Sequence, residues 1–100
     1  MKVGVTANAI ISLRTCMHVE FLGIPRERAG VAHLELDAAT LGQLFDTLTE
    51  RFPDLRELIV AGRLHPSVVA NLNGDEFVSS RQQTLSAGDH ILILSADVGG

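Results

Sequence analysis

The residues that could carry chemistry in this chain are few and widely spaced. The four histidines are His18, His33, His65 and His90, and no two of them lie four residues apart. A histidine acts as a general base or a metal ligand only when a partner group positions it, so this scatter argues against such a role. Cys16 is the only cysteine. A disulfide or a cysteine-ligated zinc site is therefore excluded within one chain, and a small buried hydrophobe is predicted at this position.

Glycine-based motifs offer no catalytic loop either. Gly23, Gly30 and Gly42 are too far apart for a phosphate-binding loop, and no nucleophile elbow is present. The most unusual feature is the pair Gly99-Gly100, which closely follows the apolar run ILIL at 91–94. At an average glycine usage of about 7%, two terminal glycines arise by chance in roughly 0.5% of chains. Whether this pair has a function has to be judged from the rest of the sequence.

Composition predicts one small folded domain. The chain has 100 residues, of which 46% are hydrophobic, and this is long enough to bury a core. The net charge of -4 argues against a nucleic-acid partner. No apolar run approaches the length of a membrane span, and the apolar stretch at the start is too short for a secretory signal. A single cysteine fits a reduced compartment, so we expect a cytoplasmic protein.

The first third of the chain reads as two strands. Residues 18–22 alternate polar and apolar as a half-buried strand does. Gly23 and Pro25 break this pattern, and we expect a solvated connection and a turn over 26–30. Alternation resumes over 31–37, which predicts a second strand that forms a hairpin with the first.

A helix is predicted next. Thr40 is a good N-cap and Gln43 can complete a capping box, while Pro53 stops the helix at or before residue 52. Asp46 and Glu50 are expected on its solvated side, and a contact with a basic partner is the alternative. The helix carries one apolar stripe, made of Leu41, Leu44, Phe45, Leu48 and Phe52.

The second half reads mainly as strands. A short helical turn over 54–59 and a loop over 62–66 lead to a third strand at 67–72. The dipeptide Asn73-Gly74 is a strong hairpin signal, and 76–78 is the returning strand.

The last strand, 90–95, determines the predicted fold. Its unbroken ILIL run indicates burial on both faces and hence a central position. The order strand, strand, helix, strand, strand, strand, taken together with the analogy to known folds, predicts an α+β ubiquitin-like β-grasp, with a mixed sheet of four to five strands and one main helix on one face. The predicted parts are an N-terminal extension over 1–16, the β-grasp domain over 17–95 and a flexible tail over 96–100.

The chain resembles the ubiquitin-like sulfur-carrier family over residues 17–100. This family includes the small subunit of molybdopterin synthase and the sulfur carriers of thiamine and cysteine biosynthesis. The first fifteen residues have no counterpart there, and the tail SADV at 95–98 stands where members often carry prolines or alanine. The segments that carry the resemblance are FLGIPRERAG at 21–30, TLGQL at 40–44, FP at 52–53, VANLNG at 69–74, LSAGDHILIL at 85–94 and the final glycine pair.

The resemblance implies a reaction at the end of the chain. In the family, an ATP-dependent activating enzyme adenylates the terminal carboxylate, and sulfur then replaces the adenylate to give a thiocarboxylate. Gly100 would carry that carboxylate, and Gly99 would let the tail enter a narrow active site. Asp97 and Val98 would contact the partners, which are the activating enzyme and a larger synthase subunit or another sulfur acceptor. No bound cofactor or metal is implied, because ATP is used by the partner.

The docking surface is expected beside the tail, on the outward side of the third and last strands, and Phe77 is its candidate centre. A core position for Phe77 is the favoured alternative, because a large aromatic on a short strand is usually packed. The destination of the sulfur is most simply molybdopterin, with cysteine or thiamine biosynthesis as alternatives. Two other functions stay open: a modifier that joins Gly100 to lysines of target proteins, and an interaction domain whose tail has no role.

Overall fold

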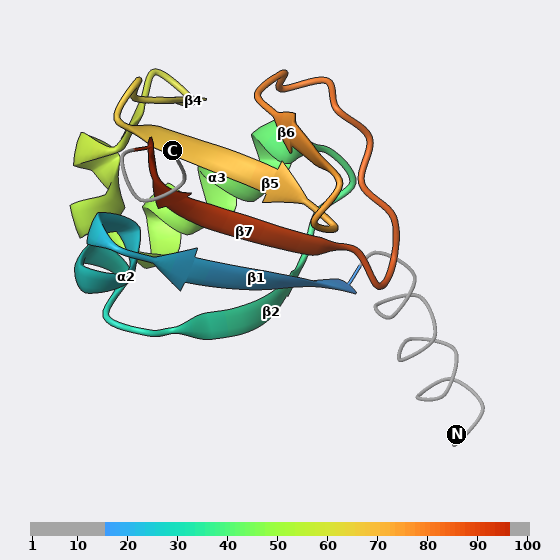
Figure 1. Ribbon diagram of the computed structural model, residues 1–100, viewed down its shortest axis with the longest axis horizontal. Helices are drawn as coiled ribbons and strands as arrows, with labels where there is room; N and C mark the ends of the chain where they lie inside the picture. The colour runs from blue at the N-terminus through green and yellow to red at the C-terminus, as the bar shows by residue number, and fades with distance from the viewer. Residues whose placement is uncertain (1–15, 97–100) are drawn as a thin grey trace.

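Five strands of this chain form one mixed sheet, and one main helix packs across a single face of it (Figure 1). The computed structural model describes residues 16–96. The strands follow the order β2-β1-β7-β5-β6, so the last strand is central, as the sequence predicted. Their bounds are Cys16–Leu22 for β1, His33–Asp37 for β2, Val68–Leu72 for β5, Glu76–Val78 for β6 and His90–Ser95 for β7.

The strand pairing confirms the β-grasp arrangement. β1 pairs antiparallel with β2 and parallel with β7, where His18 faces His90 and Leu22 faces Leu94. On its other edge β7 pairs antiparallel with β5, which in turn pairs with β6. Parallel neighbours cannot be joined by a tight turn, so the chain crosses over a face of the sheet between β1 and β7.

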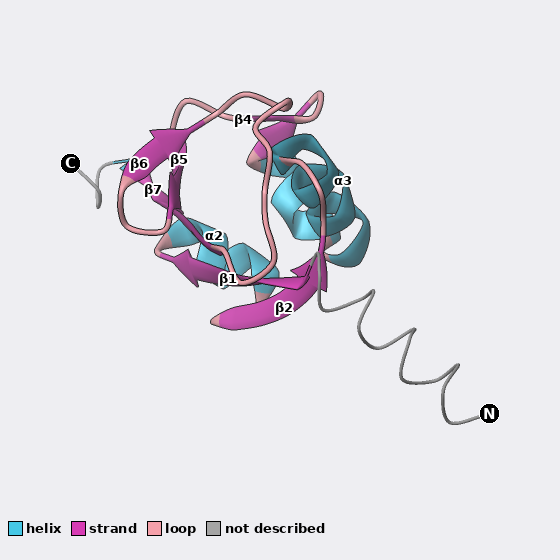
Figure 2. Cartoon of the chain, turned by 90° about the vertical axis from the view of Figure 1, so that its right-hand side faces the viewer, coloured by secondary structure: helices cyan, strands magenta, loops and turns pink. Residues whose placement is uncertain are grey.

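The helix α3, Leu41–Arg51, occupies that crossover, as the end-on view in Figure 2 shows. The predicted N-cap Thr40 is present, but the side chain of Gln43 bonds one residue before it, so the reciprocal capping box is incomplete. The Thr40 hydroxyl accepts from the Gln43 N–H at 3.2 Å, and the Gln43 side-chain oxygen accepts from the Ala39 N–H at 2.8 Å. The helix ends at the capping residue Phe52, whose ring meets Phe21 edge to face. The core joins α3 to the inner face of the sheet through Leu41, Leu44, Phe45, Leu48, Met17, Val19, Phe21, Ala70, Val78, Ile91 and Ile93.

Two segments predicted as connections are regular elements. Residues expected to be solvated form helix α2, Ile24–Ala29, which packs beside β1 and β7. Its signal is Pro25 at the first turn together with Gly30 in the left-handed region after the last turn. Pro25 was predicted only to end the first strand, whereas it also begins helix α2. The second strand accordingly begins at His33 rather than at residue 31.

The predicted loop at 62–66 was also wrong in its first part. The two-residue strands β3, Ile59–Val60, and β4, Arg63–Leu64, form a small hairpin. Ala61 and Gly62 both have positive φ, at 54° and 75°, as a two-residue turn of this kind requires. The predicted helical turn before it is the 3-10 helix η1, Pro53–Glu57.

Arg81 ties the connection before β7 to α3. Its guanidinium donates two hydrogen bonds to the Asp46 carboxylate, at 2.9 and 3.1 Å, and one to the Gly62 carbonyl oxygen at 2.8 Å. Gly42 makes room for this arrangement, because a Cβ there would lie 2.9 Å from the guanidinium carbon and 3.0 Å from the Cβ of Arg81, so that Arg81 would have to shift. Asp46 was expected to be merely solvated, and the sequence could not show that a residue 35 positions later returns to it.

This ion pair should make stability depend on pH. Hydrogen bonds from Arg81 hold the pKa of Asp46 below its usual range. A carboxylate with a lowered folded-state pKa stabilises the fold above its unfolded pKa, about 3.9, and loses that contribution as pH falls through the folded value. Urea unfolding should therefore show Asp46→Asn to be less stable than the wild type at about pH 7, with a difference that shrinks as the pH falls below about 4. Glu50→Gln, which removes an exposed carboxylate from the same helix, is the control and should change the free energy of unfolding at about pH 7 by less than about 0.5 kcal/mol.

Candidate functional site

The candidate site begins where β7 ends. Ser95 is the last residue of β7 and is 3% exposed. The next residue, Ala96, donates its N–H to the Ser67 carbonyl oxygen at 2.8 Å. The predicted site residues Asp97, Val98, Gly99 and Gly100 lie outside the described residues. The structure therefore describes the point from which these four residues start.

The end of β7 is held from two sides. The Ser95 hydroxyl accepts the Ile24 N–H at 3.0 Å, at the start of α2. On the opposite side, Ser95 pairs with Val68 of β5. Ser67 precedes that strand, and its own N–H donates to the His65 ring nitrogen Nδ1 at 3.1 Å. Residues from three separate parts of the chain thus meet at the exit of the last strand.

The face of the sheet opposite α3 is not covered by any helix in the described residues, and Figure 1 looks onto it. Toward the end of β7 this face is mainly apolar, with Asn71 as a polar residue between Phe77 and Leu92. Strand alternation and the observed pairings place five apolar side chains there, which we call the apolar patch; Leu94 is buried and the other four are at least partly exposed. It consists of Leu22, Val69, Phe77, Leu92 and Leu94.

Phe77 is the most exposed member of the apolar patch, at 63%. The favoured prediction that it is a core residue was wrong, and the alternative that places it on the surface is confirmed. Phe77 pairs with Asn71, while its neighbour Val78 takes the buried position on the inner face. A three-residue strand gives too short an alternation to tell the two faces apart from sequence. A shallow pocket of about 290 Å³ lies beside Phe77, lined among others by Leu64, Pro66 and Val69.

Three of the histidines gather on the same face, although their spacing predicted scatter. The His18 ring lies 5.2 Å from the His33 ring and 5.0 Å from the His90 ring, measured between centroids. His90 also contacts the Glu20 carboxylate at 3.1 Å. Pairing between β2, β1 and β7 brings them together, and no local pattern could predict it. Over residues 16–96, no three His, Cys, Asp or Glu side chains are arranged so that they could hold a metal ion.

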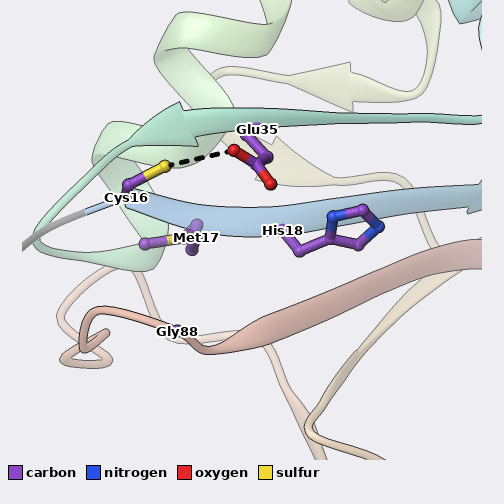
Figure 3. A pocket seen from close by; sticks show the side chains of 5 residues that line it. All are labelled: Cys16, Met17, His18, Glu35 and Gly88. Carbon is purple, nitrogen blue, oxygen red and sulfur yellow. Dashed lines mark hydrogen bonds between the residues drawn. The ribbon is translucent and has the colours of Figure 1, made fainter. Parts of the chain in front are cut away.

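Cys16 lies at the beginning of β1 in a second shallow pocket of about 380 Å³ (Figure 3). The predicted burial was wrong, because this thiol is only half-buried. It contacts a carboxylate oxygen of Glu35 on β2 at 3.8 Å. Desolvation raises the pKa of Cys16, and the negative charges of Glu35 and Asp37 raise it further. The thiol form therefore dominates at neutral pH, the opposite of what a catalytic cysteine needs.

The described residues thus offer a surface and a firmly held strand end rather than a set of catalytic side chains. In residues 16–96, no helix is both long and apolar enough to cross a membrane.

Comparison with known proteins agrees with this architecture. Residues 19–100 match the ThiS family. Among curated proteins the sequence finds no significant match.

Three solved structures illustrate the similarity of the fold. SAMP1 from Haloferax volcanii is 24% identical, with a TM-score of 0.71 over 85% of this chain and 99% of its own. A putative molybdopterin converting factor, subunit 1, from Pyrococcus furiosus is 21% identical, with a TM-score of 0.69 over 81% and 97%. A chain of the BexX/CysO complex from Amycolatopsis orientalis is 26% identical, with a TM-score of 0.69 over 84% and 99%.

Cys16 lies before the matched residues, and its chemistry can be tested separately. Replacing Glu35 with glutamine removes one charge that raises the pKa of Cys16, so more thiolate should form. Iodoacetamide should alkylate the Glu35→Gln variant roughly twofold to fivefold faster than the wild type at about pH 8. Glu20→Gln, further along β1, is the control and should leave the rate unchanged. An unchanged rate in Glu35→Gln would mean that the charge of Glu35 does not affect the reactivity of this thiol.

Proposed function

Because this chain belongs to the ThiS family, we propose that it is a sulfur-carrier protein that acts through the carboxyl group of Gly100. A partner enzyme joins this carboxylate to the AMP part of ATP and releases pyrophosphate. A sulfur nucleophile then displaces AMP and leaves a thiocarboxylate, which delivers its sulfur to an acceptor enzyme. In this proposal the chain supplies the carried atom, and its partners supply ATP and the catalytic groups.

The observation that carries the proposal is the family match itself, which continues through Gly99 and Gly100. The architecture supports it. Four residues follow Ala96, and an extended chain spans at most about 3.6 Å per residue, so Gly100 can reach about 14 Å beyond the sheet. Such a reach suits a tail that enters the active site of another protein while the domain stays outside. Gly99 and Gly100 would permit close approach of the backbone there.

The apolar patch is our proposed docking surface for the activating enzyme and for the larger synthase subunit. It lies beside the end of β7, and its most exposed member is a large aromatic side chain, the type that dominates binding energy in protein interfaces. Asp97 and Val98 would add contacts between the docked domain and the reactive end. We place this chemistry in the cytoplasm.

Molybdopterin is the proposed destination of the sulfur, so that the chain would act as a small subunit of molybdopterin synthase. Restoring molybdenum cofactor synthesis in a host that lacks its own small subunit would test this assignment. If the chain instead restored cysteine or thiamine synthesis, the carrier function would stand and the sulfur would be assigned to that pathway.

The carrier function itself can be tested by mass spectrometry. The full chain, incubated with the activating enzyme of its own organism, ATP and a sulfide donor, should gain the mass of one oxygen-to-sulfur exchange at Gly100. Deleting Gly100 should abolish the product while circular dichroism shows an unchanged fold, because β7 ends at Ser95. Absence of the product from the wild type would contradict the proposal. A Gly-Gly remnant on lysines in digests of cell extract would favour a protein modifier.

Docking can be tested at Phe77. Phe77→Ser should raise the KM of the activating enzyme for this protein roughly tenfold to a hundredfold with little change in kcat, because a central aromatic contact would be lost. The same variant should change the free energy of unfolding by less than about 0.5 kcal/mol, since the side chain is exposed. Val78→Ala is the matched control: it should cost about 2 kcal/mol of stability and leave KM near the wild-type value. An unchanged KM in Phe77→Ser would exclude the apolar patch as the docking surface.

A further inference from the structure

Ser95 is the single buried polar side chain among residues 16–96, and the chemistry proposed above does not use it. It is the last residue of the central strand, and its exposed fraction is 3%. A buried hydroxyl is tolerated when it is hydrogen-bonded, and here the partner lies 71 positions earlier in the chain. This contact calls for an explanation beyond strand formation, since strands of this kind usually bury apolar side chains.

The Ser95 hydroxyl fits against the start of α2. It accepts the Ile24 N–H at 3.0 Å, which gives an acceptor to one of the backbone groups that a helix leaves free at its beginning. Gly23 allows this approach for two reasons. Its φ is +70°, and a Cβ at this position would lie 2.7 Å from the Ser95 oxygen. The backbone of residue 23 and the hydroxyl of Ser95 are thus in close contact, and this contact leaves no room for a side chain at residue 23.

The following residue is held from the other side. Ala96 donates its N–H to the Ser67 carbonyl oxygen at 2.8 Å, and Ser67 belongs to the segment that leads into β5. Residues 95 and 96 are therefore tied to two elements on opposite sides of β7. Together with the pairing of Ser95 and Val68, these two hydrogen bonds fix the position of residues 95 and 96, which residues 97–100 follow in the sequence.

We propose that Ser95 is a positioning residue for the reaction at Gly100. Together with Gly23 it holds the exit point of residues 97–100, so that an activating enzyme docked on the domain finds the Gly100 carboxyl group at a set distance and direction. This inference rests on the proposed sulfur-carrier function.

The expected effect is moderate and falls on kcat. Without the Ser95 hydroxyl, the end of β7 loses its contact with α2 and is held only by backbone contacts on the side of β5. Fraying of residues 95 and 96 would then lengthen the tether between the last anchored residue and the end of Gly100 from four residues to six. The effective concentration of a tethered group falls with about the -3/2 power of tether length, which gives roughly twofold for this change. Loss of the exit direction adds to this, because reacting groups have to be oriented as well as close. We therefore expect kcat to fall roughly threefold to tenfold while KM stays constant, since the apolar patch is untouched.

The test measures ATP–pyrophosphate exchange by the activating enzyme with full-length Ser95→Ala, Ser95→Cys and the wild type. Ser95→Ala removes the acceptor, while Ser95→Cys keeps a side chain with a weaker one and should give an intermediate kcat. Ser86→Ala, an exposed serine at the far end of the sheet, is the matched control and should behave as the wild type. Hydrogen exchange of the Ala96 amide, followed by NMR, reports independently on the exit point and should be at least tenfold faster in Ser95→Ala.

Each outcome bears on one of the two proposals. A wild type that supports no exchange contradicts the sulfur-carrier function, whatever the variants do. A wild-type kcat in Ser95→Ala with a faster Ala96 amide shows that the exit point is released without consequence, which overturns the positioning role. An unchanged Ala96 amide overturns it as well. Should Ser95→Ala fail to fold, Ser95→Cys decides: a lower kcat at constant KM supports the role, and a wild-type kcat overturns it.

Discussion

β1 and β7 lie side by side and parallel at the centre of the sheet, although they come from opposite ends of the described chain. Parallel neighbours need a crossover, and α3 lies in that crossover and closes the core over the inner face of the sheet. The same pairing makes both strands end at one edge, where Leu22 faces Leu94. The start of α2 follows β1 there, and the end of the chain follows β7. The contact between Ile24 and Ser95 is a direct result of this geometry.

A single layer of helix leaves the opposite face of the sheet open, and that face has two different halves. The half near the end of β7 is the apolar patch, with Phe77 as its most exposed member. The half near the other end holds His18, His33 and His90 with nearby carboxylates. Neither half forms an enclosed catalytic site within the described residues. In the proposed function the chain does not need such a site, because the partner enzymes provide the catalytic groups. The domain provides the docking surface and the carboxyl group of Gly100.

The fold was largely predictable because its main signals are local. The alternation in β1, the N-cap Thr40 of α3 and the apolar run of β7 each act over a few residues. The structure confirms the strand, the cap and the central position of β7, but the predicted burial of β7 on both faces was wrong in part, because no helix covers its outer face in the described residues and Leu92 there is half-buried. The errors lie where a local signal was short or ambiguous. Pro25 begins helix α2 as well as ending a strand, and the three residues of β6 were too few to show that Phe77 points outward. Arg81 could not be assigned to Asp46, because their contact depends on packing between distant segments.

The sequence by itself determined the order of the five sheet strands and the main helix, the amphipathic character of that helix, the central last strand and the resemblance that pointed to Gly100. These features depend on the type and spacing of residues that are close together in the sequence, so they can be predicted from it. Only the tertiary structure decided which faces are open, which histidines meet and what holds the end of β7. Those features depend on strand register and on pairing between segments that lie far apart in the chain, such as Gly23 and Ile24 with Ser95. The exit of residues 97–100 from the domain is for this reason a property of the fold, while the glycine pair that ends them is a property of the sequence.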